Sequence, residues 1–151
     1  MGASIHASVV LAGARAVLIR GPSGAGKSRL TLALLRAAQT GLLPFARLVA
    51  DDRAHLEAAH GRLLARPAAG LAGLLEVHGL GIRRMPYEAV AVVALAVDLA
   101  SMDTERLPSS SNLQADIEDI TLPRLAVAAG EWALPILVAS LTTGEVYPPG
   151  I

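Results

Sequence analysis

The sequence contains no cysteine, which excludes disulfide bonds and zinc sites built on thiolates. Aromatic residues make up only 3% of the chain, so the hydrophobic core must be built from Ala, Leu, Val and Ile. The 13 basic and 13 acidic residues leave a formal net charge of zero, and a chain without a basic surplus lacks the electrostatic footprint of nucleic-acid binding. We therefore expect partners to be met at a local site, with no nucleic acid among them.

Long apolar runs and targeting signals are also missing. The longest apolar stretch, Ala89–Val97, is closed by Asp98 and falls far short of the roughly 20 residues that cross a bilayer. The N-terminal segment lacks the basic start of a secretory signal. We therefore expect a cytoplasmic protein without membrane contact, and the 151 residues predict one domain over 1–151 with a sizeable core.

What the sequence does contain is a complete phosphate-binding loop. Its eight residues match the pattern G-x-x-x-x-G-K-[ST] and follow the apolar run Ala16–Ile19: Gly21, Pro22, Ser23, Gly24, Ala25, Gly26, Lys27 and Ser28. A helix-like segment follows, so backbone N–H groups and the helix dipole would converge on a phosphate. Lys27 is expected to reach the β- and γ-phosphates and Ser28 to hold Mg²⁺. The loop predicts a site for ATP or GTP.

Periodicity and turn residues predict an α/β fold around this loop. Ala89–Leu99 is so continuously apolar that it predicts a strand buried on both faces. We expect the other elements to be strands at Ile5–Leu11, Ala16–Ile19, Arg47–Ala50 and Leu122–Ala129, a hairpin at His55–Ala65, and helices at Ser28–Ala38 and Ala133–Leu141, the second with Pro135 in its first turn. The polar stretch Thr104–Asp119 contains a loop at Pro108–Asn112.

Several acids could supply a metal ligand or a base for phosphoryl transfer. Asp51 and Asp52 follow a buried strand as a pair, which costs energy unless a cation or proton compensates. Glu76 lies in a segment flanked by glycines, and Asp98 follows an apolar strand. A lone acid at a strand end is commonly a solvated turn residue or a helix cap, and we interpret Asp98 in that way.

The basic side chains and histidines leave alternatives open. His6 is either a functional group or a polar residue on an edge strand, and Arg106 is either catalytic or a surface charge. His55, His60 and His78 have neither the helical spacing nor the neighbouring cysteines of a zinc cluster. We therefore predict no zinc site.

Taken together, four blocks resemble the C-terminal catalytic domain of HPr kinase/phosphorylase, in the short form of some proteobacteria. That bacterial enzyme phosphorylates a serine of the phosphocarrier HPr and can reverse the step. The blocks are Ile5–Ala7, Gly21–Ser28, Leu48–Asp52 and Leu74–Ile82, in that order. The phosphate loop is common to many nucleotide-binding proteins, whereas the last two blocks are much more particular to this family.

The resemblance implies a P-loop core related to phosphoenolpyruvate carboxykinase, with a mixed sheet, flanking helices and hairpins. It implies ATP and Mg²⁺ as cofactors, HPr as the partner, control of phosphotransferase-system signalling, and hexamers. The implied site has Lys27 and His6 as active-site residues, Ser28 and Glu76 as Mg²⁺ ligands beside Asp51, and Asp52 as the base that takes the serine proton. Arg106 matches a catalytic arginine.

The chain also departs from the family pattern. Pro22 and Arg29 stand where acids are usual, His78 where arginine is usual, and Glu131 where a segment associated with the reverse reaction ends in arginine. Pro22, Arg29 and His78 keep one alternative open, a non-catalytic ATP-binding regulator. A second alternative is a small-metabolite kinase, whose lid would use Arg83–Arg84 and Arg106.

Overall fold

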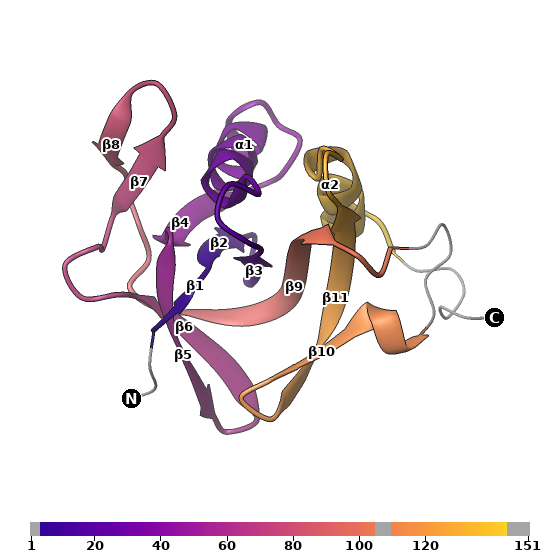
Figure 1. Ribbon diagram of the computed structural model, residues 1–151. Coiled ribbons are helices and arrows are strands. Elements are labelled where there is room, and N and C mark those ends of the chain that lie inside the picture. Colours follow the sequence, from indigo (N-terminus) through magenta and orange to yellow (C-terminus); the bar gives the residue numbers. More distant parts are fainter. Residues whose placement is uncertain (1–3, 105–109, 145–151) are drawn as a thin grey trace.

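A computed structural model describes residues 4–104 and 110–144, and Figure 1 shows two helices on one side of a curled sheet. The helices are α1 (Lys27–Gln39) and α2 (Leu134–Thr142), and a short 3₁₀ turn, η1, covers Ser110–Leu113. The strands are β1 (Ser4–His6), β2 (Ser8–Ala12), β3 (Arg15–Arg20), β4 (Ala46–Ala50), β5 (Arg53–Ala59), β6 (Arg62–Pro67), β7 (Leu74–Val77), β8 (Gly81–Arg84), β9 (Ala91–Ser101), β10 (Gln114–Ile117) and β11 (Ile120–Ala128).

The long strand β9 organises the main sheet, whose path runs β1-β5-β6-β9-β3-β2-β4. One edge of β9 pairs in parallel with β3. The other edge pairs first with β6, antiparallel through Ala91–Val93, and then with β11, parallel from Ala96 onward. The sheet is therefore mixed, and the predicted α/β class with a buried central strand is confirmed.

A β-bulge lets β9 serve two hydrophobic layers. Between Ala16/Val17 on β3 and Val93/Leu95 on β9 the register shifts by one residue. A bulge inverts the alternation of side chains, so Val93 packs into the layer beneath the sheet whereas Leu95 packs into the layer under the helices. That helix-side layer contains Leu30 and Leu34 of α1 and Leu137 of α2, all fully buried.

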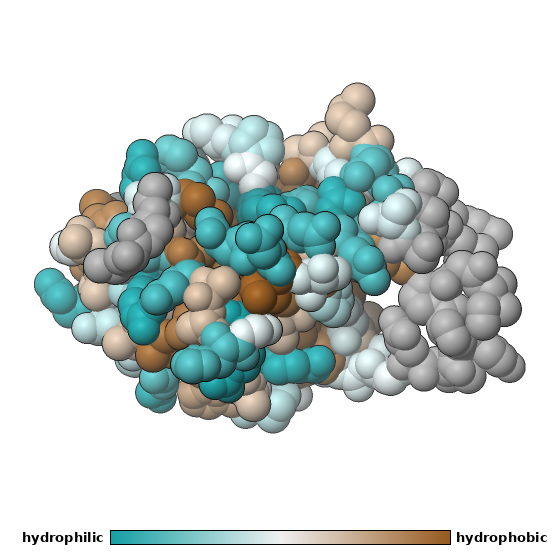
Figure 2. Space-filling model, turned by 90° about the horizontal axis from the view of Figure 1, so that it is seen from below, coloured by the Kyte–Doolittle hydropathy of each residue, from teal (hydrophilic) through white to brown (hydrophobic). Residues whose placement is uncertain are grey.

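Different elements cover the two sides of the sheet. The helices cover one side of the sheet, whereas the β5–β6 and β10–β11 hairpins close the other side. Figure 2 views the molecule from below, and there the hydrophobic residues appear as separate islands among hydrophilic ones. Among the described residues, no helix is long and apolar enough to cross a membrane.

One sequence prediction needs correction, and one segment contains a strand that the sequence did not indicate. The expected strand Ile5–Leu11 is broken at Ala7, whose N–H donates to the Asp52 carbonyl at 3.1 Å. The break sends β1 to pair with β5, while β2 pairs with β3 and β4. The described part of the polar stretch Thr104–Asp119 also contains the strand β10, because hairpin pairing with β11 outweighs its polar composition.

This topology brings three sequence-distant points to one edge of the sheet. The phosphate loop leaves the end of β3, the acid pair Asp51–Asp52 leaves the end of β4, and the β1–β2 junction lies beside them. The β7–β8 hairpin, which forms its own two-stranded sheet, packs its first strand against α1.

Candidate active site

The phosphate loop forms the predicted turn from β3 into the first helix. Gly26 is the N-cap of α1 with φ 98°, a left-handed conformation that favours glycine. No side chain caps this helix, and its first turn contains no acid. The first N–H groups of a helix have no partner within it, so this end of α1 keeps its donors and its positive potential for an anion.

Lys27 folds back over the loop. Its Nζ donates to the Gly21 carbonyl at 2.8 Å and to the Pro22 carbonyl at 3.1 Å. These bonds hold the ammonium group at the mouth of the loop. The predicted strand, loop and helix are therefore all present, with Lys27 and Ser28 in the first turn of α1.

Asp51 is the hub of the site. It is only 6% exposed, and the Ser28 hydroxyl lies 2.7 Å from its Oδ1 and 2.9 Å from its Oδ2. The Ser8 hydroxyl donates to Oδ1 at 2.8 Å, and the Glu76 backbone N–H donates to Oδ2 at 3.2 Å. Three segments of the chain therefore converge on one buried carboxylate, which offsets the cost of burying it.

Asp52 turns the other way, toward solvent. Its backbone has φ 67°, a left-handed conformation that is uncommon outside glycine. The Ser8 hydroxyl accepts its N–H at 3.3 Å, and its carbonyl accepts the N–H of Ala7. This fixed turn separates two adjacent acids, because Asp51 is buried while the Asp52 side chain stays 67% exposed.

His6 lies beside Asp52 at the end of β1. Its Nε2 is 3.0 Å from the guanidinium of Arg53. Because an arginine can only donate, Nε2 is the acceptor and the proton of a neutral ring is assigned to Nδ1. That atom lies 3.9 Å from Asp52 Oδ1. The structure therefore groups His6, Asp52 and Arg53, and sequence reasoning missed Arg53 because an arginine after two acids resembles an ordinary surface charge.

Glu76 reaches the site through its backbone. It is an exposed residue of β7 whose N–H binds Asp51. The described residues contain no group of three or more His, Asp or Glu side chains arranged to hold a metal ion. A metal here would therefore have to combine the oxygens of Ser28 and of one or two acids with those of a bound phosphate. Mg²⁺ commonly uses such a set.

Asp98 is not the solvated turn residue or cap that the sequence indicated, and that interpretation is wrong. It lies inside β9 with 17% of its side chain exposed, and it binds Arg20 at 2.7 Å and Arg124 at 2.5 Å. Burial alone would raise the pKa of Asp98, but hydrogen bonds from the two arginines outweigh burial and hold it below 3.8. Both carboxylate oxygens face arginines, so this acid is committed to an ion network.

The same network extends to Asp103. Hydrogen bonds from Arg124 and Ser101 lower the pKa of Asp103 to about 2, and hydrogen bonding to Asp103 raises the pKa of Arg124. Arg20 directly precedes the phosphate loop, so the network holds the start of that loop against the end of β9. The predicted catalytic Arg106 lies outside the described residues.

Three comparisons with known proteins show what this chain is similar to. A sequence profile of the HPr Serine kinase C-terminal domain matches residues 2–131. An HPr kinase/phosphorylase from Streptococcus thermophilus is 33% identical over 135 residues, covering 82% of this chain and 41% of that protein. An HPr kinase/phosphorylase from Clostridium tetani is 39% identical over 70 residues, covering 46% of this chain and 21% of that protein. The chain thus spans about two fifths of the length of the first of these relatives.

A solved structure supports the fold. The structure described as the Hpr(Ser) kinase/phosphatase from Coxiella burnetii superposes with a TM-score of 0.72 at 22% sequence identity. The match covers 93% of this chain and 88% of that chain. At this identity the comparison establishes the architecture.

Proposed function

The chain belongs to the HPr serine kinase C-terminal domain family, and from this membership we propose that it is an ATP- and Mg²⁺-dependent protein-serine kinase acting on the phosphocarrier HPr. The observation that carries the proposal is the placement of Asp51 and Asp52. One acid accepts a hydrogen bond from the hydroxyl of the loop serine Ser28, and its neighbour in the chain is exposed next to His6. We propose that residues 1–151 act as one catalytic domain in the cytoplasm, within phosphotransferase-system regulation.

The phosphates would lie on the loop. The N–H groups at the start of α1 and the Lys27 ammonium offer donors and positive charge to them. The Lys27 ammonium donates hydrogen bonds to two loop carbonyls. When a phosphate binds, the ammonium would donate to its oxygens instead, in stronger charge-assisted hydrogen bonds. Positioning of this kind supplies much of the catalysis in phosphoryl transfer.

The donor set beside the loop fits Mg²⁺. The Ser28 hydroxyl and the Asp51 carboxylate are hard oxygen ligands in direct contact, and Glu76 is held next to them by its backbone. We propose Ser28, Asp51 and Glu76 as the residues that hold the ion, directly or through water. When bound, Mg²⁺ would neutralise charge on the transferring phosphate oxygens.

Asp52 is the proposed base. It would accept the proton of the HPr serine hydroxyl as that oxygen attacks the γ-phosphoryl group, and ADP would leave. Because 67% of its side chain is exposed, Asp52 is accessible to a serine presented on the surface of another protein. The Nδ1 of His6 faces this carboxylate and would orient it. A catalytic role for Arg106, in which it would stabilise the charge on the transferring phosphate, stays a prediction.

The reverse reaction would use the same groups. In a phosphorylase step Asp52 would return a proton to the serine oxygen as an attacking phosphate takes the phosphoryl group. Assembly into hexamers, implied by the family resemblance, is part of the same proposal and can be measured by light scattering.

The test combines purified protein, labelled ATP and HPr. We expect label on an HPr serine, lost in Asp52→Asn while nucleotide binding persists. Asp119→Asn is a matched control, because Asp119 is also exposed and has φ 61° but lies in the distant β10–β11 turn. Folded protein that leaves HPr unlabelled would refute the proposal. Nucleotide binding without phosphate transfer would then favour a non-catalytic regulator. Phosphate transfer to a small-molecule acceptor would favour a small-metabolite kinase.

A further inference from the structure

A pocket of about 400 Å³ opens on the side of the phosphate loop that faces away from Asp51 and Asp52. We propose that this pocket takes the base of the bound nucleotide and holds it against a stacked pair, Arg29 and Trp132. The proposal rests on the nucleotide-binding part of the proposed function. It adds the subsite that would make the protein prefer a nucleotide over a bare polyphosphate.

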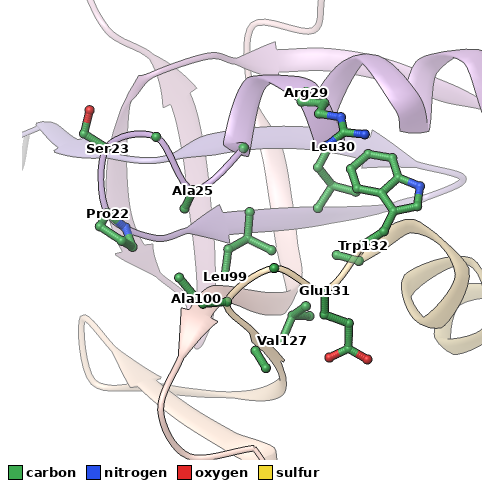
Figure 3. Close-up of a pocket in the computed structure, with 16 residues that line it drawn as sticks. Pro22, Ser23, Ala25, Arg29, Leu30, Leu99, Ala100, Val127, Glu131 and Trp132 are labelled. Carbon is green, nitrogen blue, oxygen red and sulfur yellow. The ribbon is translucent and has the colours of Figure 1, made fainter.

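The walls of the pocket come from three chain segments. The loop itself forms one wall, the end of β9 another, and the turn from β11 into α2 the third (Figure 3). Strands β9 and β11 run parallel to β3, so the pocket lies outside the carboxyl ends of neighbouring parallel strands, where α/β folds place ligands. A molecule with phosphates on the loop could enter it directly, since the loop is shared.

Part of the pocket lining is apolar. Its lining includes aliphatic side chains that are at most 7% exposed, namely Leu30, Leu99, Val127 and Ala133. A volume of about 400 Å³ is in the range of small-molecule sites, which are mostly hydrophobic with a few polar groups. A flat heteroaromatic ring could pack its face on the apolar part of this lining, while its edge meets the polar part.

Arg29 and Trp132 close one end of the pocket (Figure 3). The Arg29 guanidinium carbon lies 4.3 Å from the centre of the Trp132 ring, which is a cation–π stack. The pair joins the first turn of α1 to the segment before α2, two elements far apart in sequence. Nucleotide bases stack favourably on aromatic rings and on arginine guanidinium planes. A base in the pocket could therefore stack on this pair.

The charge of Arg29 has a further consequence. A cation in the first turn of a helix opposes the helix dipole, and here Lys27 and Arg29 both occupy that turn. Stacking on Trp132 directs the Arg29 charge toward the pocket end, away from the phosphate donors. This division leaves Lys27 for the phosphates and Arg29 for the base.

Trp132 is the single tryptophan of the chain, so its fluorescence reports on the pocket alone. The experiment titrates the protein with MgATP and with magnesium tripolyphosphate, which has the phosphates but no base. We expect ATP to change the Trp132 emission and tripolyphosphate to leave it nearly unchanged. Equal responses to the two ligands would overturn the proposal.

Calorimetry on variants supplies the second readout. We expect Trp132→Ala to weaken ATP binding by about tenfold or more with tripolyphosphate affinity unchanged, and Trp132→Phe to retain most of the ATP affinity. The matched control is Phe45→Ala, because Phe45 carries a separate cation–π contact with Arg47 at 5.2 Å near the start of β4. Unchanged ATP affinity in Trp132→Ala, or an equal loss for both ligands, would overturn the base subsite.

The same titrations separate this proposal from the kinase function. Wild-type protein that binds ATP through Trp132 but never labels HPr would support the subsite and refute the kinase. Wild-type protein that binds tripolyphosphate as tightly as ATP would refute the subsite alone. Protein that binds neither ligand would refute both.

Discussion

The hydroxyl of Ser28, the last residue of the phosphate loop, lies 2.7 Å from Oδ1 of Asp51. This contact joins the start of α1 to the end of β4. Asp51 is therefore the acid that contacts the phosphate loop. Asp98, which also follows an apolar strand segment, is bound by Arg20 and Arg124 instead. The pair therefore marks the face of the loop at which a metal and a base could act.

Replacement of Asp51 by Asn should remove Mg²⁺ dependence from nucleotide binding. An amide is a poorer Mg²⁺ ligand than a carboxylate. The NH₂ group of the asparagine could not accept the hydrogen bonds that Ser8, Ser28 and Glu76 donate to Asp51. We expect the free energy of unfolding to fall by about 1–3 kcal/mol, since buried donors would lose their acceptor. Calorimetry with and without Mg²⁺ and urea unfolding measure the two effects.

The control for that variant is Asp116→Asn. Asp116 also accepts a hydrogen bond from a hydroxyl, that of Thr121 at 2.6 Å, but at an exposed position of β10. We expect it to change neither nucleotide binding nor stability appreciably. If Asp51→Asn kept the full Mg²⁺ dependence, Asp51 would have no place in the metal site.

The left-handed backbone of Asp52 predicts opposite effects for its two smallest replacements. At φ 67° a Cβ is strained and glycine is not. We expect Asp52→Gly to unfold at the same or higher urea concentration than wild type, and Asp52→Ala to be less stable than Asp52→Gly by about 1 kcal/mol. Both should lose phosphate transfer, which separates stability from activity. An alanine variant as stable as the glycine variant would show that the turn is not strained.

The sequence predicted the phosphate loop and most of the elements because their signals are local. Pro135 correctly indicated the start of α2, and His60-Gly61 the β5–β6 turn. The break at Ala7 and the bulge in β9 depend on which strands pair, and no local pattern encodes that.

The candidate site was predictable only in part, for the same reason. Asp51 and Asp52 were found as a pair, but their division into a buried and an exposed acid depends on Ser8, which reaches them from the end of another strand. Arg29 was recognised as unusual, whereas its contact with Trp132 joins positions about a hundred residues apart. Such contacts follow from the crossover of the parallel strands.

Gly21 predicts a steric effect at the start of the loop. A Cβ at this position would lie 3.1 Å from Leu99 Cβ and 3.2 Å from the Leu99 carbonyl oxygen. Because the second contact is backbone, we expect Gly21→Ala to displace the loop, lowering stability by about 1–3 kcal/mol and weakening nucleotide binding. Gly144→Ala, where a Cβ would meet nothing within 4 Å, is the control. Wild-type nucleotide affinity in Gly21→Ala would show that the loop tolerates the shift.

The ion network around Asp98 predicts how stability depends on pH. The pKa of Asp98 is lowered in the folded protein from 3.8, and that of Asp103 from 3.8 to about 2. A carboxyl whose folded pKa is lowered stabilises the fold above its unfolded pKa and loses that contribution as pH falls through the folded value. The contribution should therefore be complete above about pH 4 and decline toward pH 2.

Asp98→Asn tests this dependence by urea unfolding at a series of pH values. Near neutral pH we expect the variant to be less stable by about 1–3 kcal/mol, because two arginines lose a partly buried anionic partner. The difference from wild type should shrink as the pH falls below about 4, because wild-type Asp98 is itself protonated as the pH passes through its lowered pKa. Asp103→Asn, at an exposed end of the network, should be far milder at neutral pH. A difference between Asp98→Asn and wild type that stayed constant from pH 7 to pH 2 would mean that the charge of Asp98 is not what holds Arg20 and Arg124 together.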